Sequence, residues 1–139
     1  MSILDSGDRT QFETGAVRDM HEGKGRMDLL PLSAIIELSK HCEEGAKKYG
    51  EHNVDKGIPQ HSLVDSGMRH LVKYMRGDTD EDHLRAAAWN IMWALNQRSE
   101  HPELNDLHGW SSEKYNQARS IMYKGLVGTD EGRCNASNM

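Results

Sequence analysis

Apolar residues recur every three or four positions in four stretches of the chain, which is the spacing of amphipathic α-helices. The first stretch covers residues 31–49, and the second covers residues 62–76. Pro31 suits the first turn of a helix, whereas Gly50 and Gly77 suit positions just after a helix end. These patterns predict two amphipathic helices that are joined by a loop.

The third stretch is apolar on nearly every side from Leu84 to Leu95, which predicts a buried helix at the centre of the fold. Thr79 is a suitable N-cap for this helix, and Asp82 follows three positions later, as in a capping box. A fourth, weaker helix is expected over residues 112–124. Long alternating β-branched runs are absent from the sequence, so we predict an all-α bundle of about four helices.

The two ends of the chain lack this periodicity. Residues 1–27 are rich in Gly, Asp, Arg and Thr, and we expect them to form an irregular arm. Residues 125–139, which include Cys134, are expected to be a frayed tail. The 139 residues have the length of one domain, so we predict a single domain over 1–139 with a core at about 23–124.

Composition argues against several functional classes. The net charge is −5, and the basic residues are scattered among acids rather than gathered in a stripe, so we expect no nucleic-acid partner. No apolar run reaches the length of a membrane span, and the first residues lack the apolar core of a signal peptide. Cys42 and Cys134 have no CxxC partner, which disfavours a zinc cluster. A cytoplasmic protein without a membrane partner is therefore expected.

Several polar residues lie on or beside the apolar faces. A buried amide without a partner costs about 1–3 kcal/mol, so Asn90 must be bonded, either as a core asparagine or as a contact to a base, a ribose or a metal site. His83 lies on the same face of the predicted third helix. His70 can likewise be a core residue or a ligand, and Arg69 beside it favours a phosphate contact.

Acidic residues gather in two places, on the first predicted helix and around the start of the third. The first group contains Glu37, Glu43 and Glu44, and the second covers residues 78–82. Mg²⁺ that is bound to a triphosphate usually takes one or two carboxylates, and a helical bundle can supply them from two helices. The alternative is that these acids are a solvated helix face and a favourable complement to a helix dipole.

Six short motifs follow one another in a distinctive order: 25–31 (GRMDLLP), 44–50 (EGAKKYG), 53–57 (NVDKG), 69–71 (RHL), 80–84 (DEDHL) and 87–90 (AAWN). Together they resemble the phage-encoded dATP/dGTP diphosphohydrolases, which belong to the all-α nucleotide pyrophosphohydrolases related to MazG. Within that group, the chain is most similar to the MazZ branch. The resemblance spans roughly residues 23–107.

The resemblance implies a metal-dependent reaction. Such a protein hydrolyses dGTP, and in some cases dATP or GTP, to the monophosphate and pyrophosphate with Mg²⁺ or Mn²⁺. Members of the MazZ branch supply dGMP for synthesis of the 2-aminoadenine nucleotide in a phage. A homodimer or homotetramer is also implied, because MazG-like folds commonly complete their sites across a subunit interface.

The resemblance also implies roles for individual residues. Glu44 and His70 would act in catalysis, and the cation ligands would be Glu37, Glu43, Glu44 and Asp82. Contacts to phosphate, sugar or base would come from Arg26, Lys48, Asn53, Arg69, His83 and Asn90.

The chain departs from the MazG pattern of acids. MazG-type enzymes carry Glu-Glu-x-x-Glu on one helix and Glu-x-x-Asp on the next. Here Glu43 and Glu44 keep the first two acids, whereas Ala87 and Asn90 replace acids of the second motif. Two alternatives therefore stay open: a nucleotide-binding regulator without turnover, and a helical phage interaction or DNA-associated protein.

Overall fold

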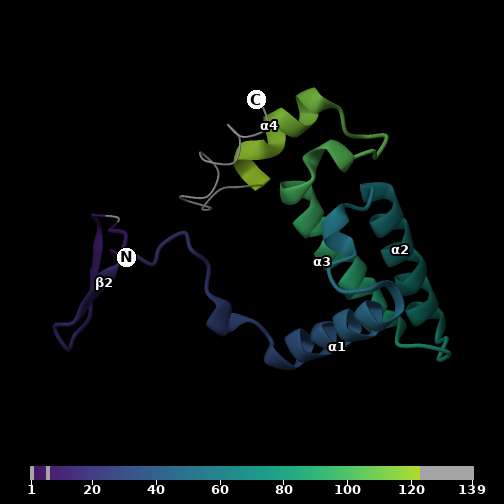
Figure 1. Ribbon diagram of the computed structural model, residues 1–139, viewed down its shortest axis with the longest axis horizontal. Coiled ribbons are helices and arrows are strands. Elements are labelled where there is room, and N and C mark those ends of the chain that lie inside the picture. Colours follow the sequence, from purple (N-terminus) through teal and green to yellow (C-terminus); the bar gives the residue numbers. More distant parts are fainter. Residues whose placement is uncertain (1, 6, 123–139) are drawn as a thin grey trace. The chain divides into compact units, whose positions relative to one another are not determined.

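The computed structural model describes residues 2–5 and 7–122, which are mainly helical (Figure 1). The chain divides into two compact units: Leu30–Ser112, and the residues on either side of it. The prediction of an all-α fold is confirmed, with one small sheet added. The helices are α1 (Leu32–Tyr49), α2 (Gln60–Arg76), α3 (His83–Glu100) and α4 (Ser112–Met122), the 3-10 helices are η1 (Met27–Leu29), η2 (Val54–Lys56) and η3 (Pro102–Leu104), and the strands are β1 (Arg9–Gln11) and β2 (Val17–Asp19).

Helices α1 and α2 end at the glycines that mark their ends in the sequence. Gly50 follows α1 with φ 90°, and Gly77 follows α2 with φ 87°, a left-handed conformation that glycine adopts without strain. The backbone N–H of Gly77 donates to carbonyls of the last turn of α2. Helix α2 begins at Gln60, two residues before the expected Ser62. Pro59 occupies the N-cap position and ends the preceding loop.

The start of α3 differs from the prediction. The N-cap is Asp82 rather than Thr79, and Asp82 Oδ1 accepts the backbone N–H of Arg85 at 3.1 Å. A carboxylate in this position satisfies one of the free N–H groups of the first turn and complements the helix dipole. Thr79 and the following acids therefore belong to the loop between α2 and α3, which leaves Asp80 and Glu81 free of helical geometry.

The core of the Leu30–Ser112 unit lies between α2 and α3, which run side by side, and α1 packs against α3 (Figure 1). Gly67 allows α2 to come close to α3. A Cβ atom added there would lie 2.9 Å from Ile91 Cδ1 and 3.4 Å from Asn90 Cβ. The buried apolar side chains among the described residues are small apart from one leucine: Leu63, Ala86, Ala87 and Ala94.

Two buried glutamines connect α3 to the start of α2. Gln60 donates through Nε2 to the carbonyl of Ala94 at 2.8 Å. Gln97, which is 1% exposed, accepts the backbone N–H of Ile58 through Oε1 at 3.0 Å. Because each amide satisfies a backbone group, burying these two polar side chains costs little free energy. The two hydrogen bonds also hold the start of α2 against α3.

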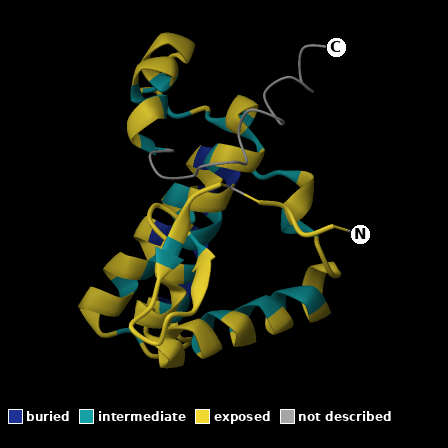
Figure 2. Cartoon of the chain, turned by 90° about the vertical axis from the view of Figure 1, so that its left-hand side faces the viewer, coloured by how far each residue is buried: buried dark blue, intermediate teal, exposed yellow. Residues whose placement is uncertain are grey.

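Helix α3 is not buried on all sides within the single chain, so that prediction is wrong. Its stripe of His83, Ala87, Asn90, Ala94 and Gln97 is buried. By contrast, three of its larger apolar residues are about half exposed: Leu84 at 46%, Ile91 at 49% and Leu95 at 55%. Figure 2 shows that much of the surface of the long helices is exposed. The apolar run of α3 therefore has one face against this chain and another facing outward.

The expected irregular arm contains a β-hairpin, which the sequence pattern did not predict. Strands β1 and β2 pair antiparallel, with Arg9 opposite Asp19. Arg9 forms ion pairs with Asp5 at 2.7 Å and with Asp19 at 3.1 Å. Strands of three residues are too short to show an alternating pattern, and charge pairing contributes to holding them together.

Helix α4 begins at the expected Ser112 and is described to Met122. The remainder of the predicted fourth helix to Lys124, the expected frayed tail and Cys134 lie outside the described residues. Within residues 2–5 and 7–122, none of the helices combines the length and the apolar character that crossing a membrane requires.

The close approach at Gly67 makes a testable prediction. Replacing an interior helical glycine by alanine normally raises the free energy of unfolding by about 0.5–1 kcal/mol. We expect Gly45→Ala on α1 to show this gain, because nothing lies within 4 Å of the added Cβ. Gly67→Ala should show no gain or a loss, because Ile91 must move. Urea unfolding followed by circular dichroism measures both.

The conservative change Ile91→Val removes the Cδ1 atom that the new Cβ would meet. It should therefore restore stability selectively in the Gly67→Ala background. Equal gains for Gly45→Ala and Gly67→Ala would contradict the close packing of α2 and α3 at this point.

Candidate functional site

Arg85, on the first turn of α3, links this helix to two acids of α1. Its Nη2 donates to Glu44 Oε1 at 2.8 Å and to Oε2 at 2.9 Å, and its Nη1 donates to Glu37 Oε2 at 3.5 Å. The Arg85 side chain is 15% exposed, whereas both acids are more open to solvent. Residues seven apart share one helix face, so the guanidinium spans the acidic stripe that the sequence predicts for α1.

The charges around this contact support one another. Burial opposes the charge of Arg85, but the hydrogen bond and charge of Glu44, with the charges of Asp82 and Glu37, outweigh it and raise the pKa of Arg85. The pKa of the Glu37 carboxyl is lowered, first by the hydrogen bond from Lys40 and next by its charge, with smaller contributions from Arg85. Glu37 is thus an ionised group at neutral pH.

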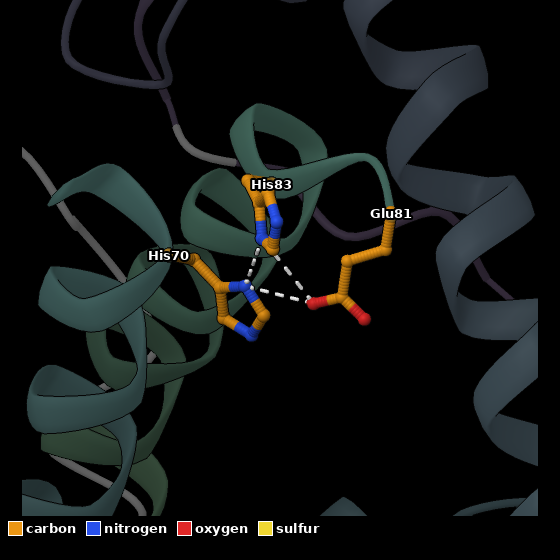
Figure 3. Close-up of side chains that lie close together, drawn as sticks. All are labelled: His70, Glu81 and His83. Atoms are coloured by element: carbon orange, nitrogen blue, oxygen red, sulfur yellow. Dashed lines mark hydrogen bonds and ion pairs between the residues drawn. The ribbon is translucent and has the colours of Figure 1, made fainter. Parts of the chain in front are cut away.

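A second group of ionisable side chains lies where α2 meets the loop before α3. His70 comes from α2, Glu81 from the loop and His83 from the first residue of α3 (Figure 3). His70 Nδ1 lies 3.0 Å from His83 Nδ1 and 3.0 Å from Glu81 Oε1, and His83 Nδ1 lies 3.4 Å from the same oxygen. We call these three residues the histidine cluster. Three donor atoms from three segments therefore converge on one point.

Asp80 orients the buried ring of this cluster. His83 is 2% exposed, and its Nε2 lies 2.7 Å from Asp80 Oδ1. The hydrogen bond with His83 is the main reason that the pKa of Asp80 is lowered, so Asp80 is a carboxylate at neutral pH. A carboxylate accepts hydrogen bonds only, so His83 Nε2 carries the proton in this contact, and a neutral His83 has its lone pair on Nδ1.

His41 lies on α1 between the two acids that Arg85 contacts. Its ring packs against Trp89 of α3 with centroids 5.1 Å apart, and its Nδ1 is buried without a hydrogen-bond partner. Burial is the main cause that lowers the pKa of His41, and the charge of Arg85 lowers it further. The charges of His70 and Glu81 also act on His41, so the α1 stripe and the histidine cluster are electrostatic neighbours.

The other residues singled out from the sequence have local partners. Asp82 caps α3, and Glu43 pairs with Lys47 on the exposed side of α1 at 3.4 Å. The ammonium of Lys48 lies 5.0 Å from the ring centroid of Tyr49. Asn90 donates through Nδ2 to the carbonyl of Ala86 at 2.8 Å, which is a bond within α3 that satisfies a core amide.

The remaining candidates also make local contacts. Arg69 forms an ion pair with Asp65 one turn earlier on α2. Arg26 forms an ion pair with Asp28 at 2.7 Å. Arg26 belongs to the unit outside Leu30–Ser112. Asn53 stands at the start of η2, where its backbone carbonyl accepts the N–H of Lys56 at 3.3 Å.

The site thus offers two donor sets for cations. Glu37 and Glu44 provide carboxylate oxygens, which are the ligands that Mg²⁺ and Mn²⁺ favour, and Arg85 beside them can bind a phosphate. The histidine cluster provides two imidazole nitrogens and one carboxylate oxygen. These residues fit a cation better than a catalytic triad, because the described acids and histidines converge without a nucleophilic serine or cysteine among them.

Sequence reasoning identified most of these residue types but missed Arg85. Its signal was present: Arg85 occupies the first turn of a helix whose neighbour carries a stripe of acids. Glu81 was placed in an acidic group without a role, and its pairing with His70 depends on the path of a loop. That path follows from the N-cap at Asp82, which the prediction had set at Thr79.

The chain matches a known protein family over most of its length. The profile of the family described as "dATP/dGTP diphosphohydrolase, N-terminal" matches residues 14–107, which is more than half of the chain. The matched stretch includes α1, α2 and α3 and so includes every residue of the two donor sets. Searches of curated proteins and of solved structures found no match.

The lowered pKa of His41 predicts a pH dependence of stability. Its pKa in the folded state is below the value of about 6.5 of the unfolded chain. The unfolded state therefore binds the proton first, and stability falls as the pH is lowered through that window. We expect the free energy of unfolding to fall less steeply between pH 7 and pH 5 in His41→Gln than in the natural sequence. Parallel slopes in denaturant titrations of the two proteins would contradict this prediction.

Proposed function

The chain belongs to the dATP/dGTP diphosphohydrolase family, and on that premise we propose that it is a metal-dependent hydrolase of purine deoxynucleoside triphosphates. It cleaves dGTP, with dATP or GTP as further substrates, between the α and β phosphates to give the monophosphate and pyrophosphate. The observation that carries the proposal is the contact of Arg85 with Glu44 and Glu37, which lies within the matched residues. It brings a phosphate-binding cation and two possible metal ligands together.

We propose Glu37 and Glu44 as ligands of Mg²⁺ or Mn²⁺. Such an ion would supply Lewis-acid chemistry at the triphosphate and would make a water molecule easier to deprotonate. Glu43 and Asp82 take second place as ligands, because Glu43 lies outside the pair of acids that Arg85 joins and Asp82 already caps α3. Arg85 holds a phosphate oxygen through its fork of N–H donors, which stabilises the negative charge of the leaving pyrophosphate.

Further residues are proposed to contact other parts of the substrate. Lys48 follows Glu44 by one turn of α1, and we propose its ammonium as a contact to the outer phosphates. Asn53, Arg69 and Asn90 stay as proposed contacts to phosphate, sugar or base. His70 and His83 act as one unit with Glu81, since their ring nitrogens meet. Supply of dGMP for 2-aminoadenine nucleotide synthesis in a phage extends the proposal to its biological setting.

The reaction is tested by product analysis with the full chain, dGTP and either MgCl₂ or MnCl₂. We expect dGMP and pyrophosphate in equal amounts. Formation of dGDP and orthophosphate would contradict cleavage between the α and β phosphates. Binding of dGTP without any product would favour the nucleotide-binding regulator, and failure to bind any nucleotide would favour the interaction protein.

Matched variants test the proposed cation site. We expect Glu44→Gln to lower kcat/KM about 100-fold or more, because a metal ion contributes several kcal/mol and each ~1.4 kcal/mol is tenfold in rate. Glu113→Gln on α4, which carries an exposed glutamate, is the control and should retain normal turnover. Circular dichroism verifies the fold of both. Normal turnover by Glu44→Gln would exclude Glu44 as a ligand.

We also propose that the chain forms a homodimer or homotetramer. The outward apolar face of α3 includes Ile91 and Leu95, and α2, which packs against α3, also exposes apolar residues such as Met68. Exposed apolar patches of this kind usually mark contact surfaces. Sedimentation equilibrium should give a multiple of the chain mass, and Leu95→Arg should move it toward a single chain. A monomer at micromolar concentration in the natural sequence would contradict the proposal.

A further inference from the structure

The histidine cluster has the geometry of a metal site in which nitrogen ligands outnumber oxygen ligands. Its donor atoms, His70 Nδ1, His83 Nδ1 and Glu81 Oε1, lie 3.0, 3.0 and 3.4 Å from one another. Ligand atoms bound about 2.1 Å from one ion lie roughly 3.0 Å apart at an octahedral angle and about 3.4 Å apart at a tetrahedral angle. The three separations thus fall in the range that a single ion requires, and Figure 3 shows the three atoms pointing at one another.

The protonation of His83 also supports a metal site. Asp80 accepts a hydrogen bond from the Nε2–H of His83, which leaves the Nδ1 lone pair directed at His70. A metal-bound histidine characteristically donates its other ring N–H to a carboxylate, which fixes the tautomer and the direction of the ring. His83 and Asp80 reproduce this arrangement, and the burial of His83 prevents the ring from turning away.

The Nδ1 atoms of His70 and His83, 3.0 Å apart, require a proton or a metal cation between them. If both Nδ1 atoms carry lone pairs, they repel; one proton from His70 or one cation relieves the repulsion. Glu81 Oε1 approaches both nitrogens and adds negative charge at the same point. A divalent cation satisfies all three atoms, whereas a single proton satisfies two of them.

We propose that His70, Glu81 and His83 bind one transition-metal ion, such as Co²⁺, Zn²⁺ or Mn²⁺, at a site separate from the carboxylates of α1. Imidazole ligands select such ions, whereas Mg²⁺ prefers an all-oxygen shell. His83 and the capped start of α3 form the fixed side of the site. Glu81 is exposed and forms the side from which an ion enters. Water fills the remaining coordination positions.

The site is tested by titrating Co²⁺ into chelator-treated full chain in the absence of nucleotide. We expect one Co²⁺ per chain, with visible absorption bands from nitrogen coordination, and no displacement by a large excess of Mg²⁺. Glu81→Gln and His70→Ala should each weaken binding at least tenfold. Asp80→Asn should weaken it by about 10- to 100-fold, as loss of the hydrogen bond behind a metal-bound histidine does.

His52→Ala is the matched control, because His52 is an exposed histidine that is paired with a carboxylate, that of Asp55, outside the cluster. It should leave Co²⁺ binding unchanged. Glu81 is exposed, so Glu81→Gln keeps the test valid even if His70→Ala fails to fold, as circular dichroism will show. Absence of Co²⁺ absorption, equal binding by Glu81→Gln, or an equal loss in His52→Ala would overturn the proposal and leave a proton-bridged histidine pair.

Metal binding at the histidine cluster is measured without substrate, so its outcome is independent of the proposed reaction. Co²⁺ binding without hydrolysis of dGTP would retain this site and remove the proposed function. Hydrolysis of dGTP without Co²⁺ binding at the cluster would do the reverse.

Discussion

The hydrogen bond by which Asp82 caps α3 decides where the rest of the site lies. An N-cap at Thr79 would add three more residues to the helix, each rotated by about 100° from the one before. With the cap at Asp82, His83 points toward His70 of α2, and Arg85, two residues later, points toward α1. One capping interaction thus directs the two ionisable groups to opposite neighbours.

The sequence predicted the long helices well, because their periodicity and their terminal glycines are local signals. It failed where the answer depends on more than a local signal. Nothing in the apolar run of α3 separates a face that packs on α2 from one that stays exposed at Ile91 and Leu95. The hairpin of β1 and β2 was missed because three-residue strands are shorter than the pattern that reveals a strand.

The candidate site was predictable in its residue types and not in its pairings. The acidic stripe of α1 followed from helix geometry, since Glu37 and Glu44 share a face. Its partner Arg85 belongs to another helix, and the contact depends on how α1 crosses α3. His70 and His83 were recognised separately, because the distance of 3.0 Å between their Nδ1 atoms depends on how α2 and α3 pack together, which no local pattern shows.

Close packing also explains why the two donor sets have different chemistry. The α1 acids lie at an open surface, where a hard cation could keep most of its water ligands. His83 is held in the protein interior, where a neutral imidazole is far less costly than a carboxylate. The fold therefore places the α1 carboxylates where solvent is available and the His83 imidazole where it is excluded. The first turn of α3 lies between these environments, because Arg85 contacts the exposed acids of α1 whereas His83 lies in the core.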